Sequence, residues 1–226
     1  MPEVLKRIKA VEEFRRSSSS KPTQKLAETP TRFHVENFPE LTYIIIPEVS
    51  SEKRKYIPMG FMTPDVIASN LVKIMPNATL YDFGILTSSV HNAWMRAVCG
   101  RLKSDYRYSK DIVYNNFPWP FNEKQRDLLA SNDSHGTNVK SVSDEQIRLL
   151  KTKIEKTAKA ILDAREKYPD SSLGEMYSNL LLYPELNKAH KENDKAIMEA
   201  YGFSLAMTEA EIVAELFRMY EELAGK

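Results

Sequence analysis

One stretch of the sequence, residues 84–120, has the residue types of a nucleic-acid contact. Between residues 96 and 110, five basic side chains oppose a single acid, Asp105, and tyrosines are interleaved with them. The basic residues are Arg96, Arg101, Lys103, Arg107 and Lys110, and the tyrosines in or just after this run are Tyr106, Tyr108 and Tyr114. Such cations neutralise phosphates, and arginine can also bind the major-groove edge of guanine through two hydrogen bonds. By composition alone, however, solvated charges above packed tyrosines are the simpler interpretation.

The charge is unevenly distributed along the chain, although the formal net charge is only +1. Residues 1–120 hold 17 Lys and Arg against 12 Asp and Glu, whereas residues 121–226 hold 15 against 19. This basic excess is weak evidence by itself, because phosphate binding needs clustered charge. No apolar run approaches the roughly 20 residues that span a bilayer, and the N-terminus lacks the apolar stretch of a signal peptide. We therefore expect a cytoplasmic protein without a membrane partner.

Sequence motifs of catalysis and metal binding are missing. None of the seven glycines forms Gly-x-Gly, which would mark a nucleotide-type cofactor site, and the sequence has neither a Pro-Pro pair nor a Glu-x-Lys. Its one cysteine, Cys99, excludes an internal disulfide, and its four histidines are too scattered for a spaced metal motif. We expect no catalytic residue, no metal and no cofactor within these 226 residues.

The front half of the chain alternates between helix and strand signals. The sequence predicts a helix over residues 3–16, strands over 41–46 and 55–61, a helix from Thr63 to Pro76, a strand over 79–86 and a helix from Ser88 or Ser89 to Gly100. The strands are predicted from β-branched and aromatic runs. The second helix is predicted because Thr63 can cap it and Pro64 would take its first position.

The back half reads as helical, because three capping boxes open apolar stripes of helical spacing. The boxes pair Ser143 with Gln146, Ser172 with Glu175 and Thr208 with Glu211, and Gly202 closes the third of four stripes. A polar connection over residues 132–138 separates the halves. We therefore predict an α+β protein, with a mixed α/β domain followed by an all-helical C-terminal domain.

An ordered series of short motifs resembles the target-recognition region of MmeI-like type IIG restriction-modification enzymes and related DNA methyltransferases. In that family a strand ending in Gly-hydrophobic-Leu-x-Ser leads to Val-His-x-x-Trp, a basic segment with Arg-Tyr-Ser, and Asn-x-Phe-Pro-Trp-Pro. The counterparts here are Gly84 to Ser88, Val90 and His91 with Trp94, Arg107 to Ser109, and Asn116 to Pro120. Residues 25–30, Met176 to Leu180 and Ala189 to Phe203 extend the resemblance over most of the chain.

The resemblance implies three segments: an N-terminal helix and polar linker (1–22), a DNA-binding target-recognition domain (23–122) and a C-terminal helical domain (140–226). It implies a piece of an adenine-specific methyltransferase that positions double-stranded DNA for a catalytic domain outside this chain. The catalytic domain, which would precede these residues in the same protein, would bind S-adenosylmethionine and flip the target base. The basic residues expected to contact DNA are Lys53, Arg54, Lys55, Arg96, Arg101, Lys103, Arg107 and Lys110.

Alternative interpretations remain open from the sequence. The helices after residue 140 could instead form a protein-interaction module that docks on the methyltransferase or on a nuclease partner, with apolar stripes exposed where that partner packs. A free-standing specificity subunit would need paired recognition domains, and the chain has room for one. Among single residues, we expect His91 and Trp94 to be core residues and His190 to lie at the surface.

Overall fold

The computed structural model describes residues 1–36, 38–121 and 143–225, so the predicted polar connection over residues 132–138 lies outside the described residues. The chain divides into two compact units, Met1–Glu40 and Leu41–Lys226, which are described separately. None of the helices in the described ranges is long and apolar enough to cross a membrane.

The first unit contains helices α1 (Pro2–Arg16) and α2 (Lys21–Lys25), followed by a 3-10 turn, η1 (Leu26–Glu28). The predicted helix over residues 3–16 is confirmed. The guanidinium of Arg15 donates hydrogen bonds to the carbonyl oxygens of Leu26, Thr29 and Arg32, at 3.0, 2.9 and 2.7 Å. One side chain thereby holds the segment after α2 against α1.

The second unit begins with an antiparallel sheet of order β3-β1-β4, formed by β1 (Tyr43–Pro47), β3 (Gly60–Met62) and β4 (Val72–Pro76). The first predicted strand is confirmed, whereas the second is strand only from Gly60. The predicted helix from Thr63 to Pro76 is wrong. The carbonyl of Thr63 accepts a hydrogen bond from the amide of Val66, which closes a single turn and not a helix. Residues 72–76 instead pair with β1 along their whole length. Five residues of sheet pairing outweigh a capping signal here, because helix propensity yields to tertiary context.

The predicted strand over residues 79–86 is also wrong, because these residues form helix α3 (Leu80–Leu86). Thr79 and Asp82 make a capping box, a signal that the run of apolar residues obscured. Four consecutive residues of α3, from Phe83 to Leu86, are buried, so no polar face marks a helical period. The Gly-Ile-Leu motif thus lies in a helix and not at the end of a strand. Helix α4 (Ser89–Val98) follows, capped by Ser88 as predicted.

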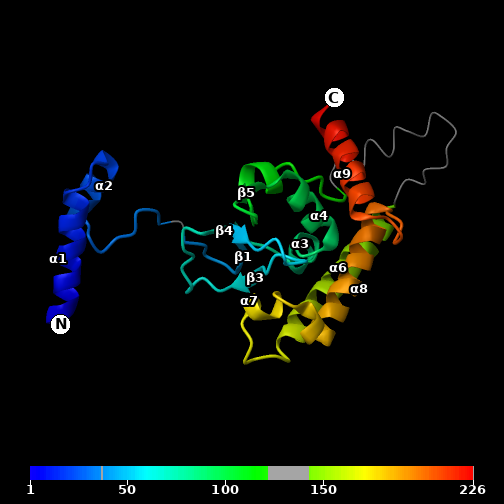
Figure 1. The fold of residues 1–226 in the computed structure, drawn as a ribbon, viewed down its shortest axis with the longest axis horizontal. Coiled ribbons are helices and arrows are strands. Elements are labelled where there is room, and N and C mark those ends of the chain that lie inside the picture. Colours follow the sequence, from blue (N-terminus) through cyan, green and yellow to red (C-terminus); the bar gives the residue numbers. More distant parts are fainter. Residues whose placement is uncertain (37, 122–142, 226) are drawn as a thin grey trace. The chain divides into compact units, whose positions relative to one another are not determined.

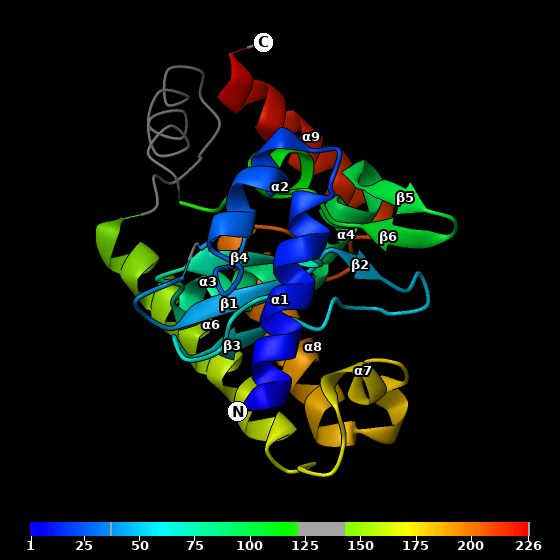
Figure 2. The ribbon, with the colours of Figure 1, turned by 90° about the vertical axis from the view of Figure 1, so that its left-hand side faces the viewer.

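A second antiparallel sheet, of order β2-β6-β5, lies beside the first (Figure 2). Its strands are β2 (Val49–Ser50), β5 (Gly100–Leu102) and β6 (Asp105–Arg107). Glu48 alone separates β1 from β2, so the chain passes directly from one sheet to the other. After β6, a turn of π-helix, η2 (Lys110–Tyr114), leads to Phe117 and Trp119, whose rings pack against each other at 5.7 Å.

The back half is helical, which confirms the predicted all-helical region (Figure 1). The elements are α6 (Asp144–Arg165), α7 (Leu173–Met176), a 3-10 turn η4 (Leu180–Leu182), α8 (Pro184–Tyr201) and α9 (Glu209–Ala224). All three predicted capping boxes are present, and Gly202 ends α8 with a φ of 68°. The apolar stripe that the capping box of Ser172 and Glu175 opens, from Leu173 to Leu181, is divided between α7 and η4 instead of forming one helix.

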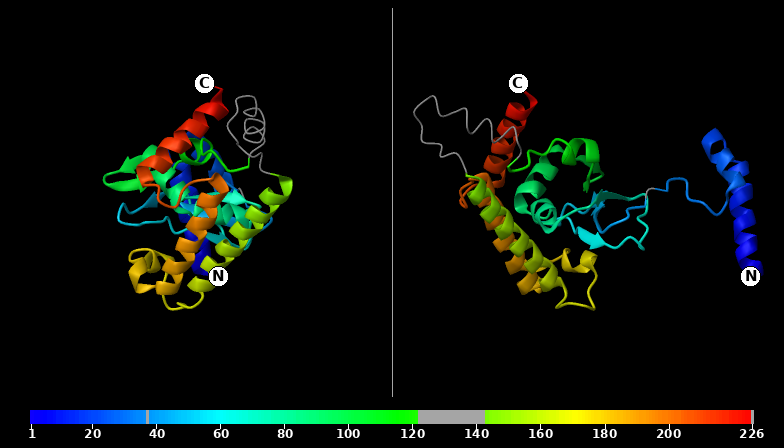
Figure 3. Two further views of the ribbon diagram at one scale, coloured as in Figure 1. Left: turned by 90° about the vertical axis from the view of Figure 1, so that its right-hand side faces the viewer. Right: turned by 180° about the vertical axis from the view of Figure 1, so that it is seen from behind.

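The helical half and the mixed half share one hydrophobic core. Helix α6 packs along both α8 and α3, and α8 lies beside α6 in both views of Figure 3. Ile154 and Ile161 of α6 are fully buried with Phe83 of α3, and Phe217 of α9 packs on Trp94 of α4 at 5.1 Å. The apolar stripes of the back half are therefore largely buried on the front half of the same unit, and the α+β fold class is confirmed.

Gly84 shows how close the two halves approach. A Cβ atom at this position would lie 2.7 Å from Cγ2 of Ile154 and 3.2 Å from Cβ of Ala158, both on α6. We expect Gly84→Ala to lower the free energy of unfolding by about 1–3 kcal/mol, because overpacking outweighs the gain in helix propensity. Urea denaturation measures the change. Gly100→Ala is the matched control, since its nearest atoms lie at 3.9 Å; equal stability of the two variants would contradict the close packing.

Candidate nucleic-acid interface

The hairpin of β5 and β6 carries three of the predicted DNA-binding residues, Arg101 and Lys103 near its turn and Arg107 at the end of β6. Leu102 pairs with Asp105 across a two-residue turn, in which Lys103 has a φ of 57°. The guanidinium of Arg101 lies over the ring of Tyr106, at 4.2 Å from its centroid, and donates a hydrogen bond to the carbonyl of Ser104. The hairpin therefore holds two exposed cations at its tip, one of them ordered by a cation-π contact.

The loop after β2 brings a third cation to this end of the sheet. The backbone amide of Glu52 donates to the carboxylate of Asp105, at 3.3 Å, which ties the loop to the hairpin turn. The next residue, Lys53, is exposed. Lys53, Arg101 and Lys103 make no ion pair with any described residue, and we call these three residues the tip cluster.

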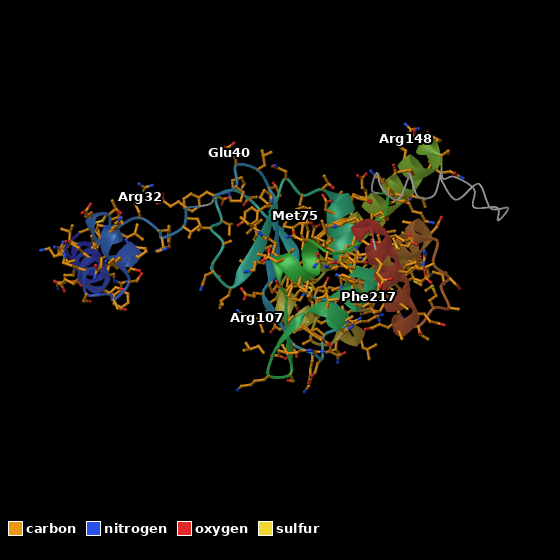
Figure 4. All side chains as sticks on the ribbon, turned by 90° about the horizontal axis from the view of Figure 1, so that it is seen from above. Arg32, Glu40, Met75, Arg107, Arg148 and Phe217 are labelled. Carbon is orange, nitrogen blue, oxygen red and sulfur yellow. The ribbon has the colours of Figure 1, made fainter. Side chains whose placement is uncertain are left out.

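Arg107 and Lys110 are exposed but lie closer to acids. Arg107, labelled in Figure 4, contacts Glu48: its Nε donates to Oε1 at 3.1 Å, and its Nη2 lies 3.0 Å from the same oxygen. The other oxygen of Glu48 accepts from Lys73 at 3.1 Å. These two hydrogen bonds, from Lys73 and Arg107, lower the pKa of Glu48. Lys110 lies 3.7 Å from Asp111.

The other three predicted residues are used within the unit. Arg96 makes a two-point ion pair with Glu209 of α9, at 2.7 and 2.8 Å, and donates to the carbonyl of Lys55 at 3.0 Å. Arg54 donates to the carbonyl of Gly174 at 3.4 Å, and the ammonium of Lys55 lies 5.0 Å from the ring of Tyr56. The structure thus places five of the eight predicted residues, exposed, on sheet β2-β6-β5, the loop after β2 and η2. Arg54 and Arg96 link the two halves, and Lys55 is exposed beside Tyr56.

Sequence reasoning missed the buried polar side chains of α8. Asn193 donates to the carbonyl of Gly84 at 2.8 Å, and Asp194 accepts from the amide of Ser89 and the hydroxyl of Tyr56, both at 2.7 Å. His190, predicted at the surface, is fully buried; its Nε2 lies 2.5 Å from the hydroxyl of Tyr177, and its ring stacks on Tyr56. That prediction is wrong because the polar neighbours of His190 in sequence belong to other faces of α8.

The hollows on the described part of the second unit include one beside α8 and α9 and a smaller one beside β4. The larger, of about 360 Å³, has Lys55, Lys191 and Lys195 at its edge over apolar side chains of α8 and α9. The smaller, of about 230 Å³, lies beside β4, with Lys73, Lys110 and Tyr114 among its lining residues. Neither hollow has the grouping of carboxylates, histidines or cysteines that holds a metal, and the rest of the described chain has none of three or more.

Comparison with known proteins places this geometry in a family. The model of the MmeI target recognition domain matches residues 1–121, and the model of the MmeI C-terminal domain matches residues 146–226. The chain belongs to the MmeI family. Sheet β2-β6-β5, with its tip cluster, therefore lies in the family's target recognition domain, and helices α6 to α9 correspond to the family's C-terminal domain.

Two known proteins show how much of a longer relative this chain corresponds to. DNA methyltransferase A of Bacillus subtilis (strain 168) is 35% identical over 225 residues, which are 100% of this chain and 23% of that protein. The solved structure of the Type IIL restriction-modification enzyme MmeI in complex with DNA matches with a TM-score of 0.83 and 42% identity, over 100% of this chain and 27% of that one. The chain spans about a quarter of the length of either relative.

The buried histidines predict how stability depends on pH. His91 is fully buried, its Nε2 lies 3.0 Å from the hydroxyl of Tyr108, and burial lowers its pKa to about 3; burial also lowers the pKa of His190. Below pH ~6.5 both histidines are protonated in the unfolded state but stay neutral in the folded state, so lowering the pH reduces the free energy of unfolding. Between pH 7 and 5.5 we expect each histidine to reduce the free energy of unfolding by about 1 kcal/mol.

The measurement is urea unfolding at several pH values, with the variant His91→Leu as comparison. The variant is expected to be less stable at every pH, because Tyr108 loses its partner, but its stability should fall less steeply from pH 7 to 5.5. An unchanged slope would show that His91 does not titrate as a buried neutral group.

Proposed function

We propose that this chain binds double-stranded DNA and selects the sequence at which a DNA methyltransferase of a restriction-modification system acts. The tip cluster carries the proposal: Lys53, Arg101 and Lys103 lie exposed at one end of a small sheet, within residues that match a target recognition domain. The solved structure that this chain resembles is a complex with DNA, which supports DNA binding by this chain.

The exposed cations and the held arginine suit different parts of a duplex. Exposed cations without acidic partners among the described residues, such as those of the tip cluster, suit phosphates, which are the same in every sequence. Arg107, held by Glu48, suits a base edge, because hydrogen bonds to a base depend on the orientation of the guanidinium donors more than on their charge. Arg54 and Arg96 are better explained as links between the halves, because Arg54 donates to the carbonyl of Gly174, and Arg96 is held by Glu209 and by the carbonyl of Lys55.

The catalytic step belongs to another part of such an enzyme. The relatives are about four times longer than this chain, and one of them is a DNA methyltransferase. Adenine would be its target and S-adenosylmethionine its cofactor, bound outside these residues because none of the seven glycines forms the Gly-x-Gly expected of a cofactor turn. The helices α6 to α9 would then hold the recognition sheet in place beside that domain.

The salt dependence of binding tests the proposal. The 226-residue chain is titrated onto a random-sequence duplex by fluorescence anisotropy at several salt concentrations. Replacing Lys53, Arg101 and Lys103 with alanine is expected to weaken binding to all sequences and to reduce the slope of log K against log salt by up to about 3, since each phosphate contact contributes roughly 0.9.

The matched control replaces Arg148, Lys156 and Lys167 with alanine, which removes one arginine and two lysines from exposed positions in or just after α6. This variant is expected to keep nearly the wild-type slope, because it removes three positive charges but no phosphate contact. Any change in its slope measures the effect of net charge alone. Equal slopes for the two triple variants would remove the tip cluster from the interface, and no binding at low salt would contradict DNA binding by this chain.

A further inference from the structure

We propose that Glu48 is a positioning residue for sequence recognition, which holds Arg107 at a fixed angle so that the arginine reads one base pair. The inference rests on the proposed DNA binding, and it assigns a role in the DNA surface to an acidic residue. An acid there is unexpected, because a carboxylate repels the phosphates that the neighbouring cations attract.

Glu48 occupies the junction of the two sheets. It is the one residue between β1 and β2; its backbone amide donates to the carbonyl of Leu71 at 3.0 Å, and its carbonyl accepts from the amide of Tyr108 at 2.7 Å. These bonds fix its backbone to the segment before β4 on one side and to the end of β6 on the other. The carboxylate therefore projects from a position that both sheets determine.

The side chain of Glu48, like its backbone, bonds to both sheets. One carboxylate oxygen accepts a hydrogen bond from Lys73 of β4, and the other accepts one from Arg107 of β6. The side chain of Glu48 is only 14% exposed, whereas that of Arg107 is 58% exposed. The anchor is thus covered, and the residue that it holds still faces solvent.

The hydrogen bonds leave a usable edge on Arg107. A guanidinium has five N–H donors, and Glu48 takes the edge formed by Nε and Nη2. Nη1 makes no hydrogen bond to a described residue, so the end formed by Nη1 and the second hydrogen of Nη2 remains available. Two parallel donors at this end match the O6 and N7 acceptors of guanine in the major groove.

Holding the arginine favours discrimination over affinity. A free arginine can turn to a phosphate and bind any sequence, whereas one held by a carboxylate keeps its orientation and its charge is partly neutralised. The acid also disfavours a phosphate close to Arg107. Removing the acid should therefore increase general affinity while it reduces sequence preference, a combination that a loss of folding would not produce.

The experiment selects duplexes from a random-sequence pool with the 226-residue chain and sequences the bound fraction. Wild type, Glu48→Gln, Arg107→Ala and the double variant are compared, with thermal unfolding as a check on folding. At one base pair, the wild type is expected to prefer G·C by about five- to 150-fold, the range of a two-point arginine contact. Arg107→Ala and Glu48→Gln should each lose most of this preference, and the double variant should lose no more than Arg107→Ala alone.

Two further variants separate positioning from general effects. Glu145→Gln removes the carboxylate that pairs with Arg148 at the start of α6, and it is expected to keep the preference at every position. Glu48→Asp retains the charge with a shorter reach, so it should retain part of the preference, and it replaces Glu48→Gln as the test if that variant does not fold.

The outcomes distinguish this inference from the proposed function. If Glu48→Gln folds and keeps the full preference that Arg107→Ala loses, then Glu48 does not position Arg107, while DNA recognition stands. If Arg107→Ala itself loses no preference, the inference fails in the same way. If the wild-type chain binds no duplex in the pool, both the inference and the proposed function fail.

Discussion

The buried polar contacts of one turn of α8 are the interaction on which the rest of the second unit depends. Asn193 binds the carbonyl of Gly84 in the last turn of α3, and Asp194 binds the amide of Ser89 in the first turn of α4. Two adjacent residues thus satisfy backbone groups on both sides of the bend between α3 and α4, where helix ends leave such groups without partners. The carboxylate also lies at the positive end of the α4 dipole, which favours its charge. Burial nevertheless raises the pKa of Asp194, so the contact depends on these hydrogen bonds being complete.

This contact links the helical half to the recognition surface. Helix α4 is followed directly by β5, so whatever fixes α4 also fixes the start of the hairpin. Helix α9 supports the same helix through Phe217 and Trp94, and Glu209 holds Arg96 at its last turn. Helices α8 and α9 therefore help to set the position of the β5–β6 hairpin, whose own three-residue strands could not be stable alone.

The sequence allowed prediction of features that depend on neighbours along the chain. The capping boxes of α6, α7 and α9 are local, and so is the cap that Ser88 provides for α4. The errors occurred where distant segments decide. Residues 72–76 became a strand because β1 offers a partner, and α3 lacked a polar face because α6 covers it. The same limit applied to the site. Arg54, Arg96 and Arg107 look alike in sequence, and only the fold shows which of them meets Gly174, Glu209 or Glu48.

The surface where sheet β2-β6-β5 meets β4 thus combines two kinds of cation. The tip cluster has exposed charges without acidic partners among the described residues, and such charges attract every duplex equally. Arg107 and Lys73 share one carboxylate, which reduces their attraction for phosphate but fixes their direction. In the proposed function, affinity from the first group would bring any DNA to the surface, and it would not distinguish one sequence from another. Discrimination must come from groups whose geometry is set before DNA arrives, because a donor that can turn to a phosphate contributes the same energy to a wrong site. In the proposed function, the acidic residue at the junction of the two sheets would therefore affect specificity more than any of the exposed lysines around it.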